Sequence, residues 1–278
     1  MTITALIQTR NEATYLADCL HSLAWTDQQV VTDSASTDGT REIALAQGAH
    51  LVDLPAATVV EEVRNEGIRL CQGNWILLLD ADERVPAKLA AKLRELSKTA
   101  DADAYALPRR NYFLGQWLEH GFWPDHQTRF FRKGTITWSN QVHSHPEVKG
   151  KLRYLPPDPQ MALEHPGYGD DLQRFIQKLV RASPVDAQRL QATVQPRIWP
   201  YLLRRPLGEF WGRYITCQAW RYGMLGVIWS VLMAYYQFLV CAHYWALIRF
   251  SSPSPPPERL RQKVRQEAIR EGLKWLLR

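Results

Sequence analysis

Residues 75–83 read Trp-Ile-Leu-Leu-Leu-Asp-Ala-Asp-Glu, and this stretch decides the fold. Its first five residues are all apolar, which predicts a strand buried on both faces, as in parallel sheets flanked by helices. Two carboxylates, Asp80 and Asp82, stand directly beyond the end of that strand. Pro86 follows and is expected to open a helix, because proline is tolerated in the first turn.

The residues before this stretch repeat the same alternation of strand and helix. Apolar or β-branched runs predict strands at 3–7, 29–33 and 51–54, and amphipathic patterns predict helices at 16–23, 37–45 and 59–70. Four alternations in about 100 residues predict an α/β fold, with a mostly parallel, Rossmann-like sheet and helices on both faces. Ligands of such sheets bind beyond the carboxyl ends of the strands.

Polar and acidic residues gather at those predicted strand ends, which indicates one site. Neither GxGxxG nor GxxxxGK[ST] occurs, so the usual dinucleotide and P-loop cradles are missing. Asp80 and Asp82 together with a diphosphate would form an oxygen cage that suits Mg²⁺ or Mn²⁺. The alternative is that this acidic pair only caps the following helix.

Four motifs in the first half occur in a characteristic order, and further matching residues follow. The motifs are Thr9-Arg10-Asn11-Glu12, residues 33–40 (DSASTDGT), Arg64-Asn65-Glu66-Gly67 and residues 79–83 (LDADE); the later residues are Trp123-Pro124-Asp125, residues 129–132 (RFFR), Trp138 and Val142-His143. Together they resemble family 2 glycosyltransferases with the GT-A fold. More narrowly, they resemble the lipopolysaccharide core β-glucosyltransferase group, the WaaE/KdtX-like proteins.

The resemblance implies a donor site for a nucleotide-sugar. It places Asp33 near the uracil and ribose, where a carboxylate accepts hydrogen bonds well. It makes Asp82 the direct metal ligand, while Asp80 contacts the ribose or a metal-bound water. The remaining donor-binding residues that it implies are Thr9, Asn11, Glu12, Arg64 and Asn65.

Family members of this kind perform inverting transfer, in which a carboxylate removes the proton of the acceptor hydroxyl. Residues 104–166 offer five acidic candidates, and Asp125 is the predicted base because it lies in the aromatic loop 121–126. We expect the aromatic residues to stack on sugar faces and, by desolvation, to raise the pKa of Asp125. The alternative role is that of a turn aspartate after a proline.

Four further residues are candidates for contact with the acceptor or the leaving group: Trp123, Arg129, His143 and His165. The histidines at 143 and 145 have no third ligand at a recognisable metal-site spacing. Ser144 follows His143, where the resembled group typically carries glutamate. This departure leaves Asp125 as the better-supported base.

The net charge of +6 hides a division within the chain. Residues 1–166 hold 17 basic and 21 acidic residues, whereas residues 167–278 hold 17 basic and 7 acidic residues. The basic part carries no recognised nucleic-acid motif, so no nucleic-acid partner is expected. The four cysteines lack CxxC spacing, and residues 2–7 are too short an apolar run for a secretory signal, so we expect a cytosolic chain with free thiols.

The basic half contains a region suited to a membrane surface. Arg205, Glu209 and Arg213 fall at steps of four beside aromatic residues, which predicts a basic amphipathic helix continuing to Arg221. Residues 223–248 then lack any Asp, Glu, Lys or Arg. Interfacial attachment, a true membrane span, and a soluble helical core or dimer face are the three interpretations.

The sequence thus predicts four regions: a GT-A catalytic domain at 1–166, a helical membrane-attached region at 167–250, a Pro/Ser linker at 251–257 and a basic tail helix at 258–278. The expected activity is inverting, metal-dependent transfer of a hexose, with glucose from UDP-glucose as the family default. The expected partners are a glycan or glycolipid acceptor, the anionic cytoplasmic face of the membrane and, through the C-terminal helices, an oligomer. The alternatives are polyprenyl-phosphate glycosyl transfer and a non-catalytic nucleotide-sugar-binding module.

Overall fold

The computed structural model describes residues 1–54, 60–138, 146–193 and 199–250. The predicted linker and tail, 251–278, and His143 lie outside the described residues. Contacts divide the chain into two compact units. The first contains Met1–Lys178 and Phe210–Val231, and the second contains Leu179–Glu209 and the chain from Leu232 onward.

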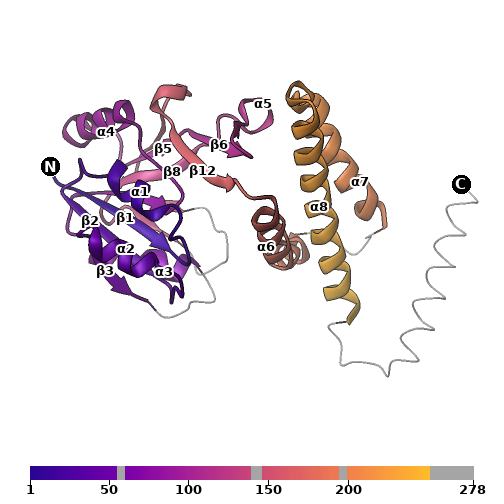
Figure 1. The fold of residues 1–278 in the computed structure, drawn as a ribbon, viewed down its shortest axis with the longest axis horizontal. Helices are drawn as coiled ribbons and strands as arrows, with labels where there is room; N and C mark the ends of the chain where they lie inside the picture. The colour runs from indigo at the N-terminus through magenta and orange to yellow at the C-terminus, as the bar shows by residue number, and fades with distance from the viewer. Residues whose placement is uncertain (55–59, 139–145, 194–198, 251–278) are drawn as a thin grey trace, which may run out of the picture. The chain divides into compact units, whose positions relative to one another are not determined.

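A seven-stranded sheet forms the centre of the first unit (Figure 1). Its strand order is β11-β5-β8-β4-β1-β2-β3, and β1, β2, β3 and β4 are parallel. Only β8 runs antiparallel to its neighbours, so the predicted mostly parallel α/β sheet is confirmed. The strands are β1 (Ile3–Thr9), β2 (Gln28–Asp33), β3 (His50–Asp53), β4 (Trp75–Asp80), β5 (Ala104–Leu107), β8 (Gln127–Arg132) and β11 (Leu152–Tyr154).

Helices cover both faces of this sheet because alternate strand residues point to opposite sides. On one face, Ile3 and Leu77 pack with residues of α1 (Leu16–Ser22), α2 (Thr40–Ala46) and α4 (Ala87–Thr99). On the other face, Leu6 and Leu78 pack with Ile68 of α3 (Val60–Leu70). Figure 1 shows α4 and α3 on opposite sides of the strands.

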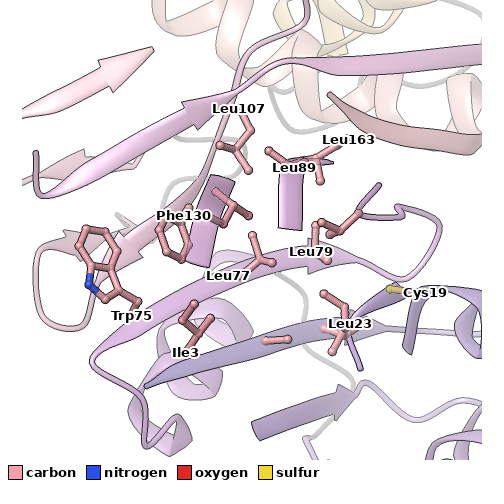
Figure 2. Close-up of a cluster of buried hydrophobic side chains, with 14 of the residues drawn as sticks. Ile3, Cys19, Leu23, Trp75, Leu77, Leu79, Leu89, Leu107, Phe130 and Leu163 are labelled. Atoms are coloured by element: carbon pink, nitrogen blue, oxygen red, sulfur yellow. The ribbon is translucent and has the colours of Figure 1, made fainter. Parts of the chain in front are cut away.

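The core of the first face is centred on β4 (Figure 2). Trp75 is fully buried and stacks on Phe130 of β8, with 4.7 Å between the ring centroids. Leu77 and Leu79 continue the row toward Leu89 of α4. This packing holds β4 in place, and thereby positions Asp80 and Asp82, which lie at and just beyond its carboxyl end.

A smaller three-stranded sheet, of order β12-β6-β7, lies in the same unit. It consists of β6 (Arg109–Phe113), β7 (Gln116–Trp117) and β12 (Leu163–Gly169). Strand β12 pairs with β6 in parallel, with His165 opposite Asn111. The remaining elements there are α5 (Glu119–Phe122), β9 (Ile136–Thr137), β10 (Glu147–Val148) and the short 3₁₀ helix Pro159–Met161.

Three longer helices follow: α6 (Leu172–Thr193), α7 (Trp199–Trp211) and α8 (Met224–Phe250). The continuous amphipathic helix expected through Arg221 is wrong, because α7 ends at Trp211 and short π and 3₁₀ turns occupy 212–222. Gln218 adopts a left-handed conformation with φ of 61°, which a regular helix does not accommodate. Helix α8 is long and apolar enough to cross a bilayer.

Candidate active site

The carboxyl ends of β1, β2 and β4 meet at one edge of the large sheet. The strand register sets Thr9 beside Asp33 and Gln8 beside Asp80. Strands β2 and β3 lie to one side of β1 and β4 lies to the other, so this edge is the point where the strand order reverses. Open α/β sheets bind their ligands at such a point. The structure therefore brings the predicted strand-end residues together.

The two carboxylates of the Asp-Ala-Asp motif have different surroundings. Asp80 contacts Arg129 and lies 3.9 Å from both Arg64 and Arg109. Burial raises the pKa of Asp80, but these guanidinium groups outweigh burial and hold it well below its usual range. Asp82 is 7% exposed and faces His165, whose Nε2 is 3.1 Å from Asp82 Oδ2.

Burial also raises the pKa of Asp82, while the charge and hydrogen bond of His165 and the charge of Lys178 lower it to about 2. The Lys178 Nζ atom lies 4.0 Å from Asp82 Oδ2. No arginine contact of Asp82 occurs among the described residues. Asp82 is thus ionised at neutral pH, and its partners are a histidine ring and a distant lysine, whereas those of Asp80 are arginines.

Glu83 lies under this edge and is fully buried. It accepts hydrogen bonds from the backbone amide of Asp80 at 3.0 Å, from Arg109 Nη1 at 2.6 Å and from Arg129 Nη2 at 2.9 Å. Arg129 is itself 5% exposed, so it lies beneath the acidic residues rather than on an open surface. These three charged side chains hold the end of β4 against β6 and β8.

Asp125 joins the same network. Its Oδ2 atom accepts from Arg109 Nε at 2.8 Å, Arg109 Nη2 at 2.7 Å and Asn111 Nδ2 at 2.9 Å, and its Oδ1 accepts from Gln127 at 2.7 Å. The expectation of a raised pKa for Asp125 is wrong. Burial does raise it, but the charge of Arg109 and the hydrogen bonds from Asn111, Arg109 and Gln127 lower it below its usual value.

His165 is 5% exposed and sits between two partners. Its Nδ1 is 2.6 Å from Asn111 Oδ1, and its Nε2 faces Asp82. Gly167, two residues on, lets the backbone of β12 approach this pair: a Cβ atom there would lie 2.5 Å from Asp82 Cβ. Any larger residue would displace Asp82 or the strand.

Asp33, which the sequence predicts to bind the donor, is fully buried and accepts from Thr9 Oγ1 at 3.1 Å, the Ser36 amide at 3.0 Å and Arg41 at 3.3 Å. Exposed Asn11 accepts from the Thr37 amide at 2.8 Å, which ties the first loop to the loop after β2.

Glu12 pairs with Arg174 of α6 at 2.6 Å. Burial raises the pKa of Glu12 despite this pairing.

Arg64 and Asn65 project from α3 toward Trp138. The Arg64 guanidinium lies 5.6 Å from the Trp138 ring centroid and donates to Gln8 at 2.9 Å. Asn65 donates to the Trp138 carbonyl at 2.8 Å and accepts from the Trp138 amide at 3.1 Å. Arg64 therefore reaches the carboxyl ends of β1 and β4, while Asn65 holds the backbone of Trp138 against α3.

Trp123, the predicted acceptor contact, packs edge-on against Trp117 with 5.4 Å between centroids. Arg110 lies 5.8 Å from the Trp117 ring centroid and pairs with Glu164. Trp117 lies on β7 of the small sheet, and Trp123 comes two residues before Asp125 in the chain, within the first unit.

The protein side chains at this edge suit a divalent metal only if a bound substrate supplies further ligands. Within the described part of the chain, no group of three or more His, Cys, Asp and Glu residues forms a metal cluster. Asp82 and His165 nevertheless converge, and Asp80 stands close by in sequence. Mg²⁺ is commonly held by one or two carboxylates plus substrate phosphates, so this donor set suits a metal bound together with a diphosphate.

Sequence reasoning missed Glu83, Arg109, Asn111 and Gly167 as members of the site. Arg109 stands beside Arg110 and Asn111 with no motif around it. Only Glu83 had a signal in the sequence, since it is the third acidic residue within positions 80–83.

Comparisons with known proteins identify relatives of the chain. A family model described as glycosyl transferase family 2 matches residues 4–148. The lipopolysaccharide core biosynthesis glycosyltransferase LpsC of Rhizobium meliloti is 27% identical over 266 residues, which cover 86% of this chain and 90% of LpsC. An uncharacterized glycosyltransferase of Rickettsia conorii is 35% identical over 147 residues, 51% of this chain. The chain spans about half the length of that relative, 52%.

Among solved structures, the mannosyltransferase PcManGT from Pyrobaculum calidifontis, in complex with GDP-Man and Mn²⁺, aligns with a TM-score of 0.47. The identity is 16%, covering 96% of this chain and 80% of that one. S. aureus TarS 1–349 in complex with UDP-GlcNAc also gives 0.47, at 15% identity over 89% and 90% of the two chains.

The buried ion network predicts a large stability effect. Glu83→Gln should lower the free energy of unfolding by about 3–5 kcal/mol, because removing one partner leaves buried arginines uncompensated. Glu95→Gln is the matched control, since the exposed Glu95–Lys92 pair should be worth about 1 kcal/mol or less. Urea unfolding of both variants checks this, and equal losses would contradict the structural role of Glu83.

Proposed function

The chain belongs to glycosyl transferase family 2, and from that premise we propose that it performs inverting, metal-dependent transfer of a hexose to a glycan acceptor. The observation that carries the proposal is the pairing of Asp82 with His165 at the carboxyl edge of β1 and β4, beside an Asp80 held by arginines. A metal bound there would supply charge neutralisation for the departing diphosphate.

The proposed donor is UDP-glucose, the default implied by the resemblance to the lipopolysaccharide core β-glucosyltransferases. Asp33, Thr9, Asn11 and Glu12 are assigned to the nucleoside side. Part of the role of Asp33 would be to hold the loop after β2 in place, because its carboxylate accepts a hydrogen bond from the Ser36 amide. Arg64 is assigned to the diphosphate side, since an arginine fork matches phosphate oxygens and its guanidinium lies 3.9 Å from Asp80.

The proposed acceptor is a lipid-linked or lipopolysaccharide-type glycan. The likeness to LpsC, whose name assigns that relative to lipopolysaccharide core biosynthesis, supports this class over 86% of the chain. The aromatic group of Trp117 and Trp123 supports it as well, because indole rings stack well on sugar faces.

Membrane attachment at the cytoplasmic face is the proposed location. Large apolar residues are exposed within residues 211–224: Trp211 by 63%, Trp220 by 53% and Met224 by 72%. Arg221 is exposed among them. Aromatic and apolar side chains beside a basic residue suit the interface of an anionic bilayer.

Interfacial attachment is favoured over a simple span of α8. Tyr236 lies near the middle of α8 in the second unit, and its hydroxyl donates a hydrogen bond to the carboxylate of Asp186 on α6. A span would carry that carboxylate to the centre of the bilayer, where an aspartate costs about 2.5–3.5 kcal/mol. An α8 that lies in the interface avoids this cost.

Removing the metal or its proposed ligand should abolish turnover. We expect sugar transfer or hydrolysis of UDP-glucose in Mn²⁺, and loss of at least 100-fold in excess EDTA or in Asp82→Ala. Asp18→Ala, which removes an exposed acid on α1, is the control and should retain activity. Undiminished turnover by Asp82→Ala would overturn the metal assignment, and no turnover with any sugar would favour a binding module.

Asp125 remains the proposed base, and its pKa sets the expected pH profile. Arg109 favours the ionised carboxylate, so Asp125 can accept a proton at any pH above its lowered pKa. The acidic limb of kcat/KM should therefore lie below pH ~4, the ordinary value for aspartate. A limb between pH 5 and 7 in folded protein would assign the base to another group.

Vesicle binding tests the attachment. The full chain should bind vesicles containing anionic phosphatidylglycerol at about 150 mM salt. The double variant Trp211→Ala and Trp220→Ala should bind about tenfold or more weakly, because burying one large apolar side chain is worth about 1.5–3 kcal/mol. Leu45→Ala is the control, a residue 62% exposed on α2. Equal binding by the double variant and the control would place the contact elsewhere.

A further inference from the structure

Asn111 lies at the centre of a hydrogen-bonded chain that joins Asp125 to Asp82. It is 1% exposed, and the pairing of β6 with β12 sets it opposite His165. Its Nδ2 donates to Asp125 Oδ2 at 2.9 Å, and its Oδ1 is 2.6 Å from His165 Nδ1. On the far side of the ring, His165 Nε2 is 3.1 Å from Asp82 Oδ2.

The chemistry of Asp125 decides which way the Asn111 amide points. Asp125 is paired with both Nε and Nη2 of Arg109, so its carboxylate only accepts hydrogen bonds. Asn111 must therefore turn its NH₂ group toward Asp125. Its carbonyl oxygen, which only accepts, is left facing His165.

A carbonyl oxygen at 2.6 Å requires that the facing ring nitrogen carry a proton. Nε2 is then the ring nitrogen that faces Asp82, 3.1 Å away. A proton on Nε2 would be donated to the Asp82 carboxylate, and a metal held at Asp82 would take the place of that proton, because an imidazole binds a metal through the nitrogen that carries none.

We propose that Asn111 is a positioning residue: oriented by Asp125, it keeps the proton of His165 on Nδ1 and leaves Nε2 available as a ligand beside Asp82. The metal part of this role rests on the proposed metal-dependent function. Partners of this kind fix the tautomer and orientation of a ligating histidine, and their loss commonly costs 10–100-fold in metal affinity.

The proposal gives Asp125 a second role, separable from that of a base. A base acts on the acceptor hydroxyl and has no effect on metal affinity. A residue that orients Asn111 changes the affinity for metal even when no acceptor is present. The two roles therefore predict different results for the same Asp125→Asn variant.

Mn²⁺ affinity of the full-length protein with UDP bound, measured by titration calorimetry, tests the inference. Asn111→Leu should bind Mn²⁺ 10–100-fold more weakly than the unsubstituted protein. Asp125→Asn should also bind more weakly, and the double variant should be no weaker than Asn111→Leu alone, because both act through one contact. Tyr112→Phe, on the same strand, is the control and should leave the affinity unchanged.

A spectroscopic signature separates this role from a loss of folding. In the complex with Mg²⁺ and UDP, the His165 Nδ1 proton should give a downfield resonance, assigned by its absence in His165→Gln and absent from Asn111→Leu. Circular dichroism establishes that the variants are folded.

Equal Mn²⁺ affinity of Asn111→Leu and the unsubstituted protein, or a His165 ring without a proton on Nδ1, would overturn the positioning role while leaving the proposed function intact. Failure of the unsubstituted protein to take up any Mn²⁺ with UDP would overturn both.

Discussion

The contact of buried Glu83 with Arg109 and Arg129 is the constraint on which the rest of the site depends. Glu83 follows β4, Arg109 lies on β6 of the small sheet, and Arg129 lies on β8 of the large sheet. A fully buried carboxylate is tolerated only when its charge and lone pairs are matched, and here two guanidinium groups and the Asp80 amide match them. The arginines in turn contact Asp80 and Asp125, so the ion network that joins the two sheets also positions these two carboxylates.

Most of the first half could be predicted because its signals are local. The apolar run 75–79 and the residue pattern of the flanking helices depend on near neighbours, and the observed strands begin and end within two residues of the predicted ones. The meeting of Thr9, Asp33 and Asp80 also followed, since parallel strands bring their carboxyl ends to one edge. The predicted family is confirmed by the match over residues 4–148.

The remainder depended on contacts between residues far apart in the chain. Arg109 reaches Glu83, 26 positions earlier, and His165 reaches Asp82 across 83 positions, and no local pattern reports either pairing. The expected pKa of Asp125 went in the wrong direction for this reason: the aromatic loop was visible in the sequence, but the opposing arginine was not. The break after Trp211 was missed similarly, because Arg205, Glu209, Arg213 and Arg221 fit one helical stripe in the sequence although the backbone turns at Gln218.

The same network makes the two aspartates of the motif unequal, although the sequence presents them as a pair. Asp80 has three arginines within 4 Å, so much of its charge is already compensated and its oxygens are engaged. Asp82 contacts the imidazole ring of His165 at 3.1 Å and a lysine at 4.0 Å, and no arginine among the described residues. A divalent cation gains most from the carboxylate whose charge is least matched. The two aspartates therefore differ in role: Asp80 pairs with the arginines at the end of the strand, and under the proposed function Asp82 is the carboxylate that would hold a metal.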